Sequence, residues 1–118
     1  MASTSPTVRS LAILRKEKYK AQVVEKWLAY GNCRVDLFGF IDIVAIREGE
    51  LGVVGVQTTS QSNVLARFKK IIMIPEAFLW INTGNRILLH GWAKKGEKGK
   101  RKLWQVSSRF ITKEDFYK

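Results

Sequence analysis

The sequence is poor in the residues that build covalent cross-links and many catalytic sites. Its 118 residues include 1 cysteine, Cys33, and 1 histidine, His90. A single cysteine excludes an intrachain disulfide and a cysteine-based zinc site. A single histidine excludes His-rich metal sites and argues against a Ser-His-Asp or Cys-His catalytic apparatus. With only 2 prolines and 46% hydrophobic residues, the composition is globular, and the length predicts one domain over residues 1–118.

Acidic residues are also scarce. The chain has 10 Asp and Glu against 21 Lys and Arg, which gives a formal net charge of +11. An excess this large in a small domain indicates a polyanionic partner, most often nucleic acid. Long apolar runs are missing too, because 11–14 is too short for a signal peptide and Pro75 and Glu76 interrupt 71–81. We therefore expect no membrane association and a cytoplasmic, intracellular location.

Hydrophobic periodicity and turn signals predict an α/β fold of order αβββααββ, in which helices flank a mixed central sheet. Two runs, 37–46 and 51–59, are apolar on both faces, which is typical of central strands, and the short turn 47–50 predicts an antiparallel hairpin. Residues 19–28 favour a strand, with helix as the competing interpretation, and 29–36 reads as a loop. The other predicted helices are 5–18, a segment that Ser60 or Ser62 caps, 75–83 and a turn in the tail, and the other predicted strands are 86–93 and 103–111.

Asp42 is the unusual acid, because it lies inside the apolar run LFGFIDIVAI, where an unpaired carboxylate is costly to bury. It needs a fixed cationic partner, and the candidates are a divalent metal and a buried salt bridge with Arg34. If Gly49 and Glu50 form the turn, Glu48 pairs with Leu51 and Asp42 lies opposite Gln57, with Cβ atoms about 5 Å apart. Thr59 shares that face of the sheet.

These residues resemble the PD-(D/E)XK nuclease superfamily, which includes restriction endonucleases and the archaeal-type Holliday junction resolvases. The matching pieces are Ile41-Asp42 and Gln57-Thr58-Thr59, and the strings RVDLFGFIDIVAI and GVQTTS look like small phage-encoded members. The resemblance implies a restriction-endonuclease-like core and a DNA endonuclease that depends on Mg²⁺ or Mn²⁺. The sequence departs from the pattern twice, because Gln57 replaces an acidic residue and Thr59 replaces the lysine.

The resemblance assigns roles to the residues that match it. Asp42 and Gln57 would ligate the metal, and Glu25 on the neighbouring strand would add the missing negative charge. Lys69 or Lys70 would replace the lysine, although ten residues of helix span about 15 Å. For Asp36, a loop cap and a ligand role remain equally open. The runner-up is a basic nucleic-acid-binding protein that keeps the nuclease fold without catalysis.

Several residues are expected to contact DNA. The basic hairpin loop 94–102 would follow the phosphate backbone as a flexible arm. The four tryptophans and His90 are expected to be structural, in the core or an interface. A domain without an appended specificity module suits a structure-selective enzyme that acts on four-way junctions as a homodimer, with 71–81 as the interface. The predicted DNA-contacting residues are Arg34, Thr59, Ser60, Arg67, Lys98, Lys100, Arg101 and Lys102.

Overall fold

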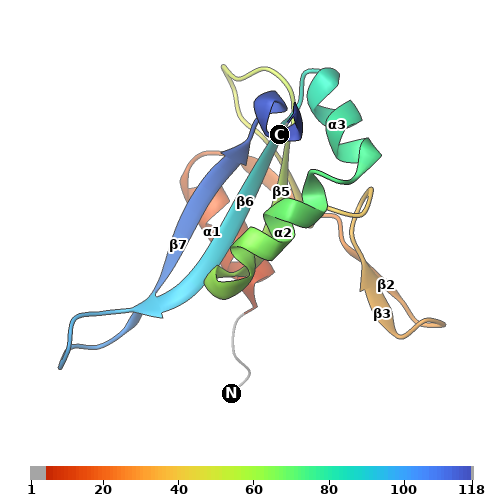
Figure 1. Ribbon diagram of the computed structural model, residues 1–118. Helices are drawn as coiled ribbons and strands as arrows, with labels where there is room; N and C mark the ends of the chain where they lie inside the picture. The colour runs from red at the N-terminus through yellow and green to blue at the C-terminus, as the bar shows by residue number, and fades with distance from the viewer. Residues whose placement is uncertain (1–4, 118) are drawn as a thin grey trace.

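The computed structural model describes residues 5–117 as a mixed five-stranded sheet flanked by helices (Figure 1). The strand order is β1-β4-β5-β6-β7, in which β5 and β6 are parallel and the other neighbours are antiparallel. A separate two-stranded sheet contains β2 (Lys26–Leu28) and β3 (Cys33–Val35). The remaining elements are α1 (Pro6–Lys16), β1 (Lys20–Val23), β4 (Ile43–Ile46), β5 (Val54–Ser60), η1 (Gln61–Asn63), α2 (Val64–Ile71), α3 (Pro75–Asn82), β6 (Arg86–Lys95), β7 (Leu103–Ile111) and η2 (Lys113–Tyr117).

Each face of the sheet has its own apolar core. On one face Leu14 of α1 packs among Ile43, Val54 and Val56. On the other face the α2–α3 crossover that joins β5 to β6 is buried through Ile71 and Ala77. β5 is buried on both faces, and its burial extends from the apolar residues at its start to Gln57, Thr58 and Thr59. The predicted α/β class, with a mixed sheet between helices, is confirmed.

The predicted start of α1 is also confirmed. Ser5 is the N-cap, and its Oγ accepts a hydrogen bond of 3.2 Å from the Val8 N–H. Pro6 occupies the first turn, where its missing N–H has no helical partner to lose. The predicted end of α3 is confirmed as well, because Gly84 follows this helix in the left-handed conformation, with φ of 91°.

The central hairpin has the predicted register. Ile43 pairs with Val56 and Ala45 with Val54, so the pairing places Asp42 beside Gln57. The predicted turn at 47–50 is present, because the Glu50 N–H donates to the Arg47 carbonyl at 3.2 Å, but the β4–β5 pairing already ends at Ala45 and Val54, and the turn belongs to a longer loop over 47–53. Within that loop the carboxylate of Glu50 forms ion pairs with Arg47 and Arg86, which replace the expected Glu48–Leu51 pairing.

Three segments differ from the predicted order. The segment 19–28 is extended, so the helical interpretation is wrong, but it contains two strands, β1 and β2, rather than one. The expected loop 29–36 supplies β3, which pairs with β2. The expected strand 37–46 is a strand only from Ile43, because 37–41 forms a tight turn in which Leu37 and Ile41 exchange backbone hydrogen bonds. Phe38 and Gly39 have φ of 55° and 83° there, a conformation that a strand cannot contain.

His90 has the structural role that was predicted. It is buried in β6, and its Nδ1 lies 2.9 Å from the Ser10 Oγ, which also accepts a 2.8 Å hydrogen bond from the Trp92 indole. Burial lowers the pKa of His90 to about 4, so the ring is neutral near pH 7. This network fastens α1 to the sheet. None of the helices within residues 5–117 has both the length and the apolar character that crossing a bilayer requires.

Candidate functional site

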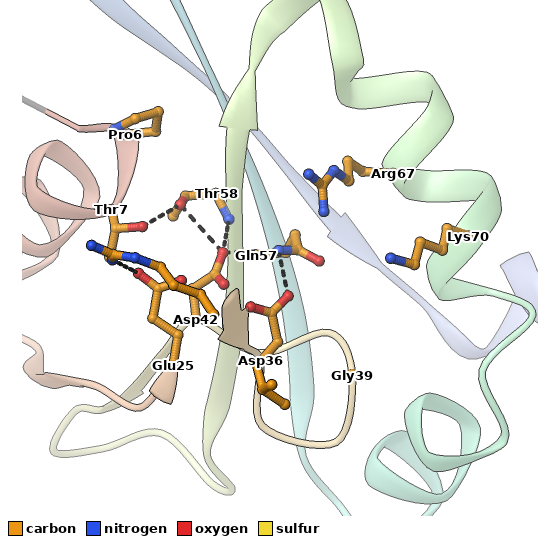
Figure 2. A pocket seen from close by; sticks show the side chains of 12 residues that line it. Pro6, Thr7, Glu25, Asp36, Gly39, Asp42, Gln57, Thr58, Arg67 and Lys70 are labelled. Atoms are coloured by element: carbon orange, nitrogen blue, oxygen red, sulfur yellow. Dashed lines mark hydrogen bonds and ion pairs between the residues drawn. The ribbon is translucent and has the colours of Figure 1, made fainter. Parts of the chain in front are cut away.

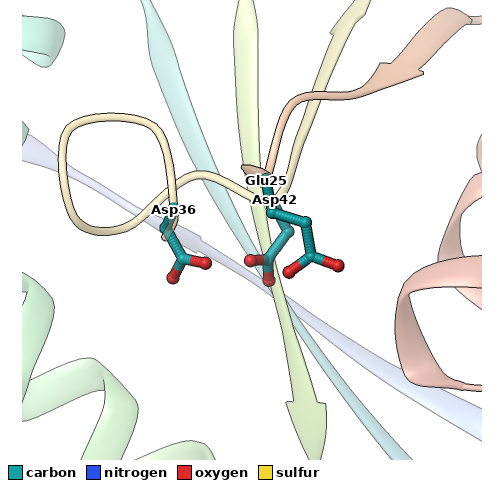
Figure 3. Close-up of side chains that lie close together, drawn as sticks. All are labelled: Glu25, Asp36 and Asp42. Carbon is teal, nitrogen blue, oxygen red and sulfur yellow. The ribbon is translucent and has the colours of Figure 1, made fainter. Parts of the chain in front are cut away.

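Three carboxylates meet at one end of the sheet. Glu25, Asp36 and Asp42 each present an oxygen, and these oxygens lie within 4.8 Å of one another (Figure 3). Glu25 lies between β1 and β2, Asp36 directly follows β3, and Asp42 directly precedes β4. In a continuous strand, Asp36 and Asp42 would be about 20 Å apart. The tight turn at 37–41 brings them together.

The backbone fixes Glu25 beside Asp42. The Asp42 carbonyl accepts hydrogen bonds from the N–H groups of Val24 and Glu25, at 2.8 and 3.3 Å. On its other side, the Asp42 N–H donates to the Val56 carbonyl at 2.8 Å. Asp42 is therefore held between β5 and the segment that carries Glu25. This position places Glu25 beside Asp42, where a second acidic residue was predicted.

The Asp42 carboxylate is buried and surrounded by donors from β5. Only 3% of Asp42 is exposed. Its Oδ2 accepts hydrogen bonds from the Gln57 Nε2 and the Thr58 N–H, both at 2.8 Å, and from the Thr58 Oγ1 at 3.3 Å. Burial and the neighbouring Asp36 carboxyl nevertheless raise the pKa of Asp42 to about 7. The site therefore concentrates negative charge beyond what its own donors compensate.

Gln57 lies where the register predicted, but it faces the acids with its nitrogen. The Nε2 that bonds Asp42 also lies 3.4 Å from the Asp36 Oδ2, so one amide links two carboxylates. An amide nitrogen cannot ligate a cation, whereas its oxygen can. Gln57 can act as the predicted metal ligand only after its amide rotates to present Oε1.

Basic side chains line the cavity around the carboxylates. The cavity has a volume of about 500 Å³, and Arg34 contributes to its wall. Arg67 and Lys70 contribute to it as well (Figure 2). Arg34 Nη1 donates to Glu25 Oε1 at 2.8 Å, so the alternative in which Arg34 neutralises Asp42 is wrong. Arg67 and Lys70 extend from α2 on the opposite side from α1. The cavity thus combines an acidic floor with a basic wall.

The two lysines proposed to replace the missing family lysine are separated by the structure. Lys70 lines the cavity, whereas the exposed Lys69 is not among the described residues that do. Lys70 reaches the cavity although it lies ten residues beyond the end of β5, because α2 packs against β5 and β6.

The end of β5 contributes Thr58 rather than Thr59. Thr59 lies on the Gln57 face, but it is only 6% exposed and does not line the cavity described above, so contact of its hydroxyl with DNA stays a prediction. Thr58 was missed as a site residue, although it bonds Asp42 and its Oγ1 lies 3.0 Å from the Thr7 Oγ1 of α1. Ser60 is half-buried, with its Oγ 3.2 Å from the Ser62 Oγ. No sequence signal points to Thr58 apart from its adjacency to Gln57.

The predicted basic arm is a projecting ribbon. β6 and β7 extend together away from the sheet (Figure 1), and the loop at their tip carries exposed basic residues. The Lys100 Nζ lies 3.2 Å from the Glu97 carboxylate, an exposed pair that leaves the net charge strongly positive. The four basic residues predicted to contact DNA are all exposed there: Lys98, Lys100, Arg101 and Lys102.

The tryptophans divide between core and surface. Trp92 is buried and Trp80 half-buried, as predicted. Trp27 and Trp104 are 56% and 44% exposed, so of the two predicted positions, core or interface, the core is wrong for both and the interface stays a prediction. Trp104 is covered partly by the guanidinium of Arg9, 3.7 Å from the ring centroid. Trp27 lies in the β2–β3 hairpin, which lacks a core of its own.

Comparisons with protein-family models, with curated proteins and with solved structures found no match to this chain. The function must therefore be argued from the residues of the cavity and their chemistry.

Proposed function

We propose that the chain is a DNA endonuclease that requires Mg²⁺ or Mn²⁺, with a restriction-endonuclease-like core. The observation that carries the proposal is the cluster of Glu25, Asp36 and Asp42, whose carboxylate oxygens lie within 4.8 Å of one another. The chain has a net charge of +11, so a local cluster of three acidic side chains is unusual in it. Three clustered negative charges favour a cation as the ligand.

The donor set fits a hard divalent cation. Mg²⁺ and Mn²⁺ prefer carboxylate and other oxygen ligands, and the cluster offers three carboxylates from three segments. The raised pKa of Asp42 indicates that its negative charge is poorly compensated without a cation. Glu25, Asp36 and Asp42 would hold the ion. When bound, it would supply an activated water and neutralise charge that develops on the scissile phosphate.

The other residues of the cavity position the acids and the phosphate. Gln57 and Thr58 fix Asp42 by donating to one of its oxygens, and Arg34 fixes Glu25. Arg67 and Lys70 line the same cavity and would pair with phosphate oxygens. We assign to Lys70 the role of the lysine in the family pattern, because it reaches the cavity from α2.

The test is cleavage of labelled four-way-junction, duplex and single-stranded DNA, with Mg²⁺, Mn²⁺ or EDTA in parallel. We expect cleavage with either metal, none with EDTA, and none from Asp42→Asn even where it binds DNA as the wild type does. Glu48→Gln is the matched control, because it removes one carboxylate charge from an exposed residue of the 47–53 loop. Equal cleavage by the wild type and Asp42→Asn would refute the assignment.

A second function, DNA binding without cleavage, is favoured by one observation. Gln57 already donates from its amide to both Asp36 and Asp42, so it partly compensates the acids without a metal. Under this proposal the cavity is a remnant, and the basic ribbon supplies the affinity. Isothermal titration with Mn²⁺ separates the two functions, because only the nuclease predicts binding that Asp42→Asn abolishes.

The proposed substrate is branched DNA, which a homodimer would cut on two strands. Two symmetric cuts require two active sites, and each chain contributes one cavity. Met73 and Leu79 are exposed apolar residues at 71–81, the segment proposed as the dimer interface. Sedimentation of the wild type against Leu79→Glu tests it, since a charge in the interface would yield a monomer.

A further inference from the structure

The β2–β3 hairpin is a projecting element that is separate from the central sheet. We call residues 26–35 the finger; its two strands pair only with each other in the sheet topology and extend away from the body of the protein (Figure 1). All six of its strand residues are exposed or half-buried. An isolated two-stranded hairpin is marginally stable in water. Its side chains therefore do not serve a core.

The finger carries aromatic and basic groups together. Trp27 is 56% exposed and Tyr30 is 90% exposed. The segment 26–35 contains two basic residues, Lys26 and Arg34, and no acidic residue. Exposed aromatic rings beside positive charge are the combination that binds unpaired bases, because every base has a face that stacks on a ring while the cations meet the backbone.

The position of Trp27 connects the finger to the cavity. Trp27 lies directly opposite Arg34 across the two strands, so the two side chains stand on the same face, with Cβ atoms about 5 Å apart. Arg34 lines the cavity and bonds Glu25 of the carboxylate cluster. One side chain therefore separates the exposed indole from the proposed metal ligands.

We propose that Trp27 stacks on an unpaired base of a strand whose phosphate occupies the cavity, which makes the substrate single-stranded DNA or DNA with unpaired nucleotides at the cut. The inference rests on the proposed function for the phosphate position. In an intact duplex each base is already stacked on its neighbours, and exposing its face costs a few kcal/mol. The finger therefore favours DNA that already has unstacked, unpaired bases, as at branch points, flaps and gaps.

The first experiment measures affinity in EDTA, where cleavage does not interfere. A labelled oligothymidine and a duplex of the same length are titrated with the wild type, Trp27→Ala and Trp27→Phe at one salt concentration. We expect Trp27→Ala to weaken single-strand binding on the order of 5-fold or more. Duplex binding stays unchanged, and Trp27→Phe retains most of the single-strand affinity because it keeps an aromatic ring.

The matched control is Tyr117→Ala. Tyr117 is an exposed aromatic residue of η2, against Phe78 of α3, and it is 69% exposed. Its replacement should leave both affinities unchanged. Unaltered single-strand affinity in Trp27→Ala would overturn the inference. An equal loss on single strand and duplex, or the same loss from Tyr117→Ala, would overturn it as well.

Tryptophan fluorescence gives an independent readout. Stacking on thymine should quench Trp27, so saturating oligothymidine should quench the wild type more than Trp27→Phe. Equal quenching would overturn the inference even if Trp27→Ala failed to fold. The result is also separable from the nuclease proposal. If Trp27 stacks on bases but no metal supports cleavage, the proposal for the finger stands and the nuclease proposal is wrong. If the protein cleaves DNA but Trp27→Ala binds single strands as the wild type does, the nuclease proposal stands and the proposal for the finger is wrong.

Discussion

Replacing Asp42 with asparagine is expected to stabilise the protein near pH 8 when no divalent cation is present. Asparagine keeps the size of the side chain and an oxygen that can accept from Gln57 and Thr58, but it removes the charge. Burial and Asp36 raise the pKa of Asp42 from 3.8 to about 7, so the folded state disfavours the ionised form. At 1.36 kcal/mol for each pKa unit, the ionised carboxylate costs on the order of 4 kcal/mol.

The sign of the pH dependence follows from that shift. The folded pKa lies above the unfolded pKa, so the cost is absent below about pH 4, grows as pH rises towards 7 and is complete above it. In EDTA at about pH 8, Asp42→Asn should therefore unfold at a temperature roughly 10–20 °C higher than the wild type. At about pH 5 most of that difference should disappear.

The measured quantity is the difference in unfolding free energy between the two proteins at each pH. His90 also titrates, because its folded pKa of about 4 lies below its unfolded value of 6.5, so it destabilises the protein as pH falls through that range. Both proteins contain His90, so its effect cancels in the difference. Glu48→Gln, an exposed carboxylate replacement, controls for the change in net charge and should show no pH-dependent gain.

Adding Mg²⁺ should narrow the difference in stability. A cation at about 100 times its Kd stabilises the folded state by about 2.7 kcal/mol, which offsets more than half of the cost of about 4 kcal/mol, and only the wild type has the full set of carboxylates. Urea denaturation with and without Mg²⁺ measures this directly. Asp42 does not carry an uncompensated charge at this site if Asp42→Asn is no more stable than the wild type near pH 8 in EDTA, or if Mg²⁺ stabilises both proteins equally.

Three further changes test the other parts of the site. Lys70→Ala should reduce turnover on saturating DNA by tenfold or more, as a rough value for a lost catalytic contact, while Lys69→Ala leaves it unchanged; steady-state kinetics measure both. Gln57→Glu adds a fourth carboxylate, so it should lower the melting temperature in EDTA and tighten Mn²⁺ binding by calorimetry. Neutralising the four basic residues predicted to contact DNA in the β6–β7 loop should reduce the slope of log K against log salt by about 0.9 for each lost phosphate contact, and an unchanged slope would make the loop a bystander.

Long periodic elements and the central register could be predicted from the sequence. The hydrophobic patterns of α1, β6 and β7 and the residues at their ends predicted a helix and two strands, and the structure has these elements within two residues of the predicted bounds. The β4–β5 register followed from counting outward from a turn at Gly49 and Glu50, and a one-residue slip would have separated Asp42 from Gln57. That single inference placed Asp42 beside Gln57, which the 2.8 Å hydrogen bond confirms.

The carboxylate cluster could not be completed from the sequence because it depends on backbone conformations with weak signals. Asp36 joins Asp42 only through the turn at 37–41, whose Phe38 adopts a left-handed conformation that non-glycine residues seldom take. Gly39 was the single hint, within a run whose apolar pattern favours a strand. The finger was missed for a related reason, since strands of three residues carry too little periodicity to detect.

The surroundings of Gln57 and Thr59 give a physical reason for each of the two departures from the nuclease pattern. An acid at position 57 would add a fourth carboxylate to Glu25, Asp36 and Asp42, whereas Gln57 donates hydrogen bonds to two of them. The turn and the segment before β2 thus provide the negative charge that β5 lacks. A lysine at position 59 would have to bury its ammonium, because Thr59 is enclosed in β5, and an unpaired buried charge is strongly disfavoured. Lys70 offers the same cation from α2 with its stem at the surface, so the site proposed here keeps both charges of the pattern but draws them from different elements.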